Sequence, residues 1–269
     1  MLSKKTPIGV RQRLASGLCI DQDFRTSVRL VLFETGYEGW EYATHGGTLF
    51  LVNFRGKVYG LTCRHVLKDF DWPQLRITEK KFGQQFARLR GLVYPSDPRG
   101  EAVDTDILDI AVIEFAPEVT PTFFADPPYV LDTNTAASSN SGNVLYVNGL
   151  IKEKTELEGE QITPVFSLLE FCDRGATSSD VSLREAYAEF ASPEFTEVTG
   201  ISGAPVFNAT STKLAGMVVQ GALDGSKCTI WYVDIFDIMQ FLTAVAEGRA
   251  DTDYTKTILG VVRTPVQEQ

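Results

Sequence analysis

The sequence predicts an all-β protein whose chain ends in a helix. Short apolar segments alternate with turn-forming Gly, Pro and Asp residues over most of the chain, which is typical of a β-sandwich or β-barrel. The pattern changes only in residues 235–247, and Gly248 follows where a helix C-cap belongs. Apolar residues recur there at helical spacing, namely Ile235, Ile238, Met239, Leu242 and Val245.

Each expected strand is bounded by turn residues. Segments 48–52 and 58–62 flank Arg55, Gly56 and Lys57, and together they predict a hairpin. The full set of expected strands is 28–33, 48–52, 58–62, 85–89, 107–115, 144–150, 163–171, 185–191, 204–207, 214–220 and 229–233. Residues 132–142 are rich in Thr, Ser, Asn and Ala and are the best candidate for a connector between two halves.

Composition excludes several classes of function. The net charge of −10 gives little support to nucleic-acid binding, which needs clustered Lys and Arg. No stretch approaches 18 apolar residues, so we expect no membrane span. Arg11 and Arg13 interrupt the place where the apolar part of a signal peptide would lie, so we expect a cytoplasmic protein.

The four cysteines are widely spaced and include no CxxC pair, so no zinc site is expected. They are Cys19, Cys63, Cys172 and Cys228. Without a secretion signal, we expect them to be reduced thiols rather than two disulfides.

Three short motifs carry the residues of a nucleophilic site. His65 follows an expected strand, Asp109 begins the apolar run of another, and Ser202 lies in a turn framed by Gly200 and Gly203. Such a turn exposes a serine, and a His held by a carboxylate is the base that a serine needs. The amides of Gly200 and Ser202 would then form an oxyanion hole.

Each residue also has a simpler interpretation. The serine motif alone is compatible with an ordinary Gly-rich turn, His65 with a partly buried structural His, and Asp109 with a turn residue. The competing base is His45, which lies beside Gly46 in an apparent turn. Asp104 and Asp106 are alternative acids, but neither leads directly into the strand.

In these motifs the chain resembles the trypsin-like (chymotrypsin-fold) serine peptidases, especially the shorter bacterial-type members. LTCRHV at 61–66 is similar to the family's TAAHV/C, DIAV at 109–112 to DIAL, and GISGAP at 200–205 to GDSGGP. LAGMVVQG at 214–221 resembles the strand that pairs with the substrate backbone. The resemblance covers roughly residues 28–247.

The resemblance implies two packed six-stranded antiparallel β-barrels with a C-terminal helix. Residues 1–27 would lead into a first barrel (28–131) that carries His65 and Asp109, and the connector (132–142) would join it to a second barrel (143–248) that carries Ser202, followed by a tail (249–269). It implies a serine endopeptidase that forms an acyl-enzyme on protein or peptide substrates. It implies no metal and no other cofactor.

Departures from the family pattern are informative. Ile201 replaces the Asp that pairs with a new N-terminus, so we expect no activation by N-terminal clipping. Val66 replaces a Cys, which removes a family disulfide, and Cys63 replaces an Ala and is interpreted as a small buried side chain.

Substrate contacts are implied at four positions. Thr196, six residues before Ser202, would form the base of the specificity pocket, and Val219, Gln220 and Gly221 would line the substrate. An uncharged Thr196 and an open Gly221 favour a small or apolar residue before the scissile bond. Glu194 or Glu197 could instead favour basic residues.

Three alternative functions remain. The chain could be a catalytically inactive, protease-like binding or scaffold module, or an esterase or transferase that uses the same triad. The α/β-hydrolases fit poorly, because their Ser lies in GxSxG and precedes the acid and the His. A latent enzyme that a regulatory protein partner switches on is compatible with the endopeptidase hypothesis. Residues 151–200 could be a partner-docking loop or a gate over the site.

Overall fold

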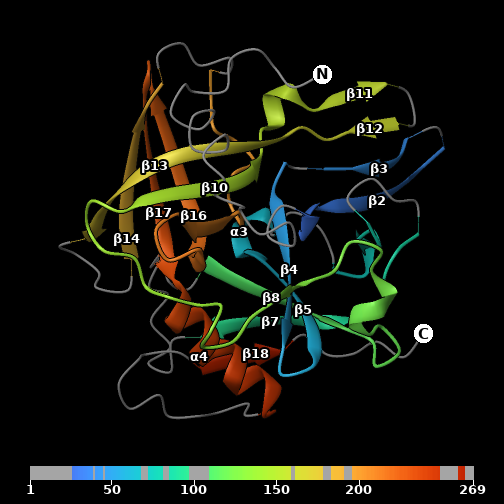
Figure 1. Ribbon diagram of the computed structural model, residues 1–269. Helices are drawn as coiled ribbons and strands as arrows, with labels where there is room; N and C mark the ends of the chain where they lie inside the picture. The colour runs from blue at the N-terminus through green and yellow to red at the C-terminus, as the bar shows by residue number, and fades with distance from the viewer. Residues whose placement is uncertain are drawn as a thin grey trace.

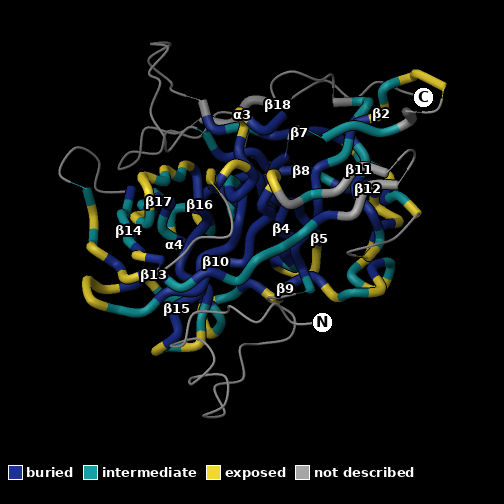
Figure 2. Tube along the Cα trace, turned by 90° about the horizontal axis from the view of Figure 1, so that it is seen from above, coloured by how far each residue is buried: buried dark blue, intermediate teal, exposed yellow. Residues whose placement is uncertain are grey.

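The computed structural model describes residues 26–38, 40–44, 46–67, 72–80, 85–96, 109–158, 161–177, 183–190, 196–248 and 260–263. They form two β units that lie side by side, with helix α4 (Ile235–Ala246) across their lower side in Figure 1. In Figure 2 the buried segments run through both units and between them. The predicted all-β class with a C-terminal helix is confirmed.

The second half of the chain is a closed six-stranded antiparallel barrel. Its strands, in order around the barrel, are β10 (Val144–Leu150), β13 (Phe166–Ala176), β14 (Leu183–Glu189), β17 (Lys227–Asp234), β16 (Lys213–Asp224) and β15 (Pro205–Asn208). Alternate residues such as Leu145, Val147, Val206 and Ile230 fill its interior. Because β15 pairs with both β10 and β16, the barrel closes beside the turn that contains Ser202.

The first half consists of two sheets. The larger has the order β1 (Val28–Leu30), β4 (Thr48–Phe54), β5 (Lys57–Cys63), β8 (Ile110–Phe115), β7 (Leu89–Ser96) and β18 (Gly260–Arg263), and β9 (Tyr129–Val130) pairs in parallel with β4. The smaller has the order β3 (Trp40–Ala43), β2 (Leu32–Tyr37) and β6 (Leu75–Arg76). Among the described strands, hydrogen bonds close a complete ring only in the second half.

Several strand predictions differ from the structure. The expected strand 28–33 is divided at Val31, which donates its N–H to the Gly47 carbonyl, so β1 and β2 enter different sheets. In segment 85–89, Phe86 makes only an isolated bridge to Thr78, and the long strand β7 begins at Leu89. Strand β18 comes from the segment expected to be a tail and pairs with β7.

The remaining elements are short. They are α3 (Arg64–Leu67), the 3-10 turns η1 (Trp72–Gln74), η3 (Pro121–Phe123) and η4 (Lys152–Lys154), and the hairpin of β11 (Glu156–Glu158) and β12 (Gln161–Thr163).

Helix α4 forms where the sequence predicts it. The Asp234 carboxylate accepts a hydrogen bond from the Phe236 amide and caps the N-terminus. Gly248 has a φ of +67°, which suits the residue after a helix C-cap. The apolar face is buried against β16 and β17. In the part of the chain that the structure describes, no helix is long and apolar enough to cross a membrane.

A charged network is buried in the wall of the second barrel. The Asp173 carboxylate, on β13, accepts hydrogen bonds from Arg184 Nη2 (2.9 Å), Tyr232 Oη (3.0 Å) and the Gly175 amide (2.7 Å). Burial and the Asp173 charge raise the pKa of Tyr232. The network therefore joins β13, β14 and β17 through one carboxylate.

Candidate functional site

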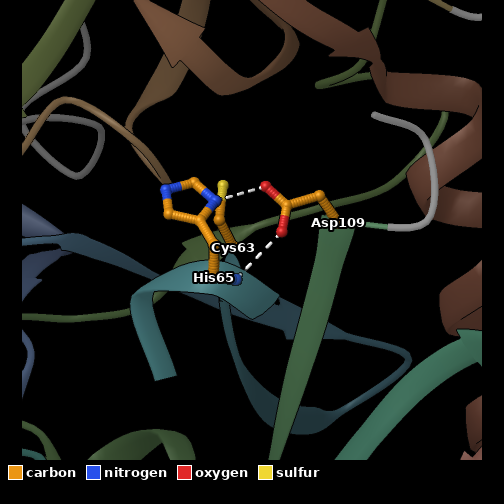
Figure 3. A group of neighbouring side chains, drawn as sticks. All are labelled: Cys63, His65 and Asp109. Carbon is orange, nitrogen blue, oxygen red and sulfur yellow. Dashed lines mark hydrogen bonds and ion pairs between the residues drawn. The ribbon is translucent and has the colours of Figure 1, made fainter. Parts of the chain in front are cut away.

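The register of two neighbouring strands brings His65 and Asp109 together. Strand β5 ends at Cys63, which pairs with Ile110 at the start of β8, so Asp109 lies opposite the α3 turn that carries His65. His65 Nδ1 lies 2.5 Å from Asp109 Oδ2, and the His65 backbone N–H donates to Asp109 Oδ1 at 2.9 Å (Figure 3). One carboxylate thus fixes both the ring and the backbone of His65, which leaves Nε2 for a reactant.

Ser202 lies in a compact turn between Val198 and Ala204. The Ile201 amide donates to the Val198 carbonyl at 3.2 Å, and Gly200 between them has a φ of +104°. A four-residue turn with a positive φ at its third residue, but not at its second, is typical of type II, which favours a glycine at the third position. Among the described residues, the Gly200 and Ser202 amides have no hydrogen-bond partner, so both N–H groups are available to an oxyanion.

The Ser202 side chain and His65 line one cleft but are not bonded to each other in the described part of the chain. Ser202 Oγ donates to the Val219 carbonyl at 3.3 Å. The cleft has a volume of about 540 Å³ and contains every predicted site residue except Asp109. Its walls include Gly46, Val66, Val198, Thr199 and Leu223, which the sequence did not suggest.

Thr48 is a contributor to the site that sequence reasoning missed. This residue of β4 is fully buried, and its amide donates to the Ser202 carbonyl at 2.9 Å. Its hydroxyl donates to the Gly200 carbonyl at 2.8 Å and accepts from the Leu150 amide at 2.9 Å. A strand of the first half therefore holds the Ser202 turn of the second half. No local sequence signal marks this role.

The edge of β16 beside Ser202 is suited to an extended ligand. Strand β15 pairs with β16 only up to Met217, whereas β17 pairs with β16 as far as Asp224. Among the described strands, the other edge of Val219–Gly221 has no partner, and Val219 lies at a bulge between Val218 and Gln220. A Cβ at Gly221 would lie 3.0 Å from Val198 Cγ2, so a side chain here would press on Val198 in the cleft wall.

Thr196 lines the cleft but is exposed and lies on a polar rim. Its N–H and Oγ1 donate to Glu153 Oε2 at 2.7 and 3.1 Å, and the Glu197 amide donates to the same oxygen at 3.3 Å. The structure therefore shows Thr196 fixed by the η4 turn. His45, Asp104, Asp106 and Glu194 lie outside the described residues.

One cluster has the donor types of a metal site. Cys63 Sγ, one His65 ring nitrogen and one Asp109 oxygen lie within 4.8 Å of one another. Cys63 is buried, as the sequence analysis expects, and its thiol donates to the Val218 carbonyl at 3.3 Å. Cys63, Cys172 and Cys228 are free thiols, and Cys19 lies outside the described residues.

The chain is similar in fold to solved serine-protease structures. A thermostable serine protease, AL20, from an extremophilic microorganism matches with a TM-score of 0.53 at 12% identity, over 84% of this chain and 99% of the other. A scabies mite inactivated protease paralogue matches with a TM-score of 0.52 at 15% identity, over 86% and 97%. An inactive form of Rv3671c from M. tuberculosis matches with a TM-score of 0.47 at 14% identity, over 88% and 93%. No protein-family model and no curated protein matches the chain.

Proposed function

We propose that this chain, which has the chymotrypsin-like fold, is a serine endopeptidase with His65, Asp109 and Ser202 as its catalytic residues. The observation that carries the proposal is the pairing of His65 Nδ1 with Asp109 beside a cleft that His65 and Ser202 both line. The Gly200 and Ser202 amides in this cleft have no hydrogen-bond partner among the described residues. A base, its orienting acid, a nucleophile and an oxyanion site are the parts that acyl transfer requires.

The proposed reaction begins when Ser202 Oγ turns from the Val219 carbonyl toward His65 Nε2. His65 accepts the hydroxyl proton while Oγ bonds to the substrate carbonyl carbon, and Asp109 stabilises the imidazolium. The Gly200 and Ser202 amides bind the oxyanion. His65 then gives its proton to the leaving amine as the C–N bond breaks, and water hydrolyses the acyl-enzyme with His65 again as the base.

The proposed substrate is an extended peptide that adds to the open edge of β16 along Val219–Gly221. The residue before the scissile bond would enter the cleft beside Val198 and Gly221, whose surfaces favour a small or apolar side chain. Glu197 at the rim is the one described acidic group that lines the cleft. Cleavage profiling of a peptide library tests this preference, and a dominant requirement for Arg would contradict it.

The second candidate is a catalytically inactive, protease-like binding module. The observation that favours it is the hydrogen bond of Ser202 Oγ to Val219 rather than to His65. One of the similar structures is described as an inactivated protease paralogue, which illustrates that the fold is compatible with this role.

A fluorophosphonate probe separates the two candidates. If the endopeptidase proposal is correct, the folded wild type is labelled and Ser202→Ala and His65→Ala are not. If the folded wild type is not labelled, even with a peptide library present as ligand, the site is latent or dead, and partners that bind residues 151–200 are sought next. Thr199→Ala is a matched control, because Thr199 lines the same cleft outside the proposed triad.

A further inference from the structure

The Cys63 thiol lies against the face of the His65–Asp109 pair that is turned into the protein. Cys63 is fully buried, whereas the side chains of Asp109 and His65 are 21% and 45% exposed. Figure 3 shows the sulfur beside the hydrogen bond that joins the ring to the carboxylate. A cation could therefore approach from the exposed His–Asp side and meet the thiol at the closed end.

We propose that Cys63, His65 and Asp109 form an inhibitory site for a divalent cation of the zinc type. Zn–N and Zn–O bonds of about 2.0–2.2 Å and a Zn–S bond of about 2.3 Å place tetrahedral ligand atoms about 3.3–3.7 Å apart. The three donor atoms already lie within 4.8 Å, and Nδ1 and Oδ2 are 2.5 Å apart. Side-chain shifts of about 1 Å would make room for the ion.

The donor set also fits the charge of such an ion. A thiolate and a carboxylate together neutralise Zn²⁺, and a neutral imidazole supplies the third ligand, so the loaded site carries no net charge. Binding releases the thiol proton to solvent. Sulfur and imidazole ligands select Zn²⁺ over Mg²⁺ and Ca²⁺, which prefer oxygen ligands.

Occupation would switch the tautomer of His65. The hydrogen bond to Asp109 places a proton on Nδ1 and leaves the lone pair of Nε2 facing the cleft. A neutral imidazole bound to a metal through Nδ1 must carry its proton on Nε2 instead. Nε2 then becomes a donor and cannot accept the Ser202 proton, so the ion would inhibit without covering Ser202. This regulatory step depends on the proposed function, whereas metal binding itself does not.

The test uses Co²⁺ as a spectroscopic probe of the intact chain and Zn²⁺ as a competitor. A thiolate-to-cobalt charge-transfer band should appear at one ion per chain and disappear when Zn²⁺ is added. Cys63→Ala and Cys63→Ser should lack this band and bind Zn²⁺ more than about 10-fold more weakly by calorimetry, since loss of even an outer-shell partner costs 10–100-fold. Serine keeps a donor for the Val218 carbonyl, so it tests the thiolate with little change in packing.

Cys172→Ala is the matched control, because Cys172 is an exposed free thiol outside the cluster. It should keep the band and the affinity of the wild type. A band that survives in Cys63→Ser and is lost in Cys172→Ala would overturn the proposal, as would equal Zn²⁺ affinity in the wild type and both Cys63 variants. If the enzyme proves active, Zn²⁺ should inhibit the wild type and not Cys63→Ser. Absence of fluorophosphonate labelling would contradict the endopeptidase function alone.

Discussion

The Thr48 hydroxyl donates a hydrogen bond of 2.8 Å to the Gly200 carbonyl, across the boundary between the two halves of the protein. Thr48 belongs to β4 of the first half, whereas Gly200 supplies one of the two amides proposed to bind the oxyanion. The same hydroxyl accepts from the Leu150 amide, and the Thr48 amide holds the Ser202 carbonyl. Thr48, a residue remote in sequence, therefore fixes the Gly200–Ile201 peptide, which directly follows the peptide that carries the Gly200 amide.

Replacement of Thr48 by Val should lower activity more than binding. The change leaves the Gly200 carbonyl and the Leu150 amide unpaired, at a cost of about 1–3 kcal/mol for each buried group. We expect kcat to fall on the order of 10- to 100-fold with little change in KM, because a displaced oxyanion donor acts on the transition state. Thr48→Ser retains the hydroxyl and should restore most of kcat. Equal kcat in the two variants would exclude this positioning role.

Gly203 should tolerate no side chain. It has a φ of +85°, and a Cβ there would lie 1.9 Å from the Thr48 carbonyl oxygen. We expect Gly203→Ala to abolish fluorophosphonate labelling and to lower the melting temperature strongly. Gly142→Ala separates steric conflict from backbone strain, because Gly142 has a similar φ of +87° with no atom within 4 Å of the new Cβ. Gly142→Ala should lower the free energy of unfolding by only about 1 kcal/mol and leave fluorophosphonate labelling intact.

The Asp173 network should contribute strongly to the stability of the second barrel. Asp173→Asn removes a buried charge that pairs with Arg184, and breaking such a pair costs about 3–5 kcal/mol. Chemical denaturation should show this loss in the free energy of unfolding. The matched control is Glu185→Gln, whose pair with Arg174 is partly exposed and should cost less than about 1 kcal/mol. Similar losses in the two variants would contradict the assigned importance of burial.

Stability should decline in alkaline solution. Burial raises the pKa of the Cys228 thiol to about 12, and burial with the Asp173 charge raises that of Tyr232. Both groups hold their protons more tightly in the folded protein than in the unfolded chain. Their contribution to the free energy of unfolding is therefore complete below the unfolded pKa values of about 8.5 and 10, and it is lost as the pH rises above these values. Unfolding free energies at pH 7, 9 and 10.5 should fall in that order. Cys228→Ala should flatten the decline, and Cys172→Ala should not.

Local sequence context was sufficient to propose a nucleophile, a base and an acid. His65, Asp109 and Ser202 each stand at the end of an apolar strand or in a glycine turn, and the structure places His65 and Ser202 on one cleft and Asp109 against His65. The barrel of the second half was predictable for the same reason, since its strands are apolar segments bounded by turn residues.

Features that depend on distant pairing could not be predicted. Thr48 is an ordinary strand residue in sequence, and its partners Leu150, Gly200 and Ser202 come from the other half of the chain. Cys63 meets Asp109 only through the register of β5 against β8. Segment 85–89 was expected to be a strand, yet Phe86 makes an isolated bridge to Thr78 and pairing with β8 begins only at the last residue, Leu89.

The pairing of β18 with β7 has a consequence for the order in which the protein is assembled. Strand β7 ends at Ser96, but its partner at this edge begins only at Gly260. During synthesis, the edge of β7 therefore lacks its partner β18 until the whole second barrel and helix α4 have left the ribosome. Open strand edges invite pairing with other chains. A chain that stops after α4 should thus be more prone to aggregate than the full chain, even with every residue of the cleft present.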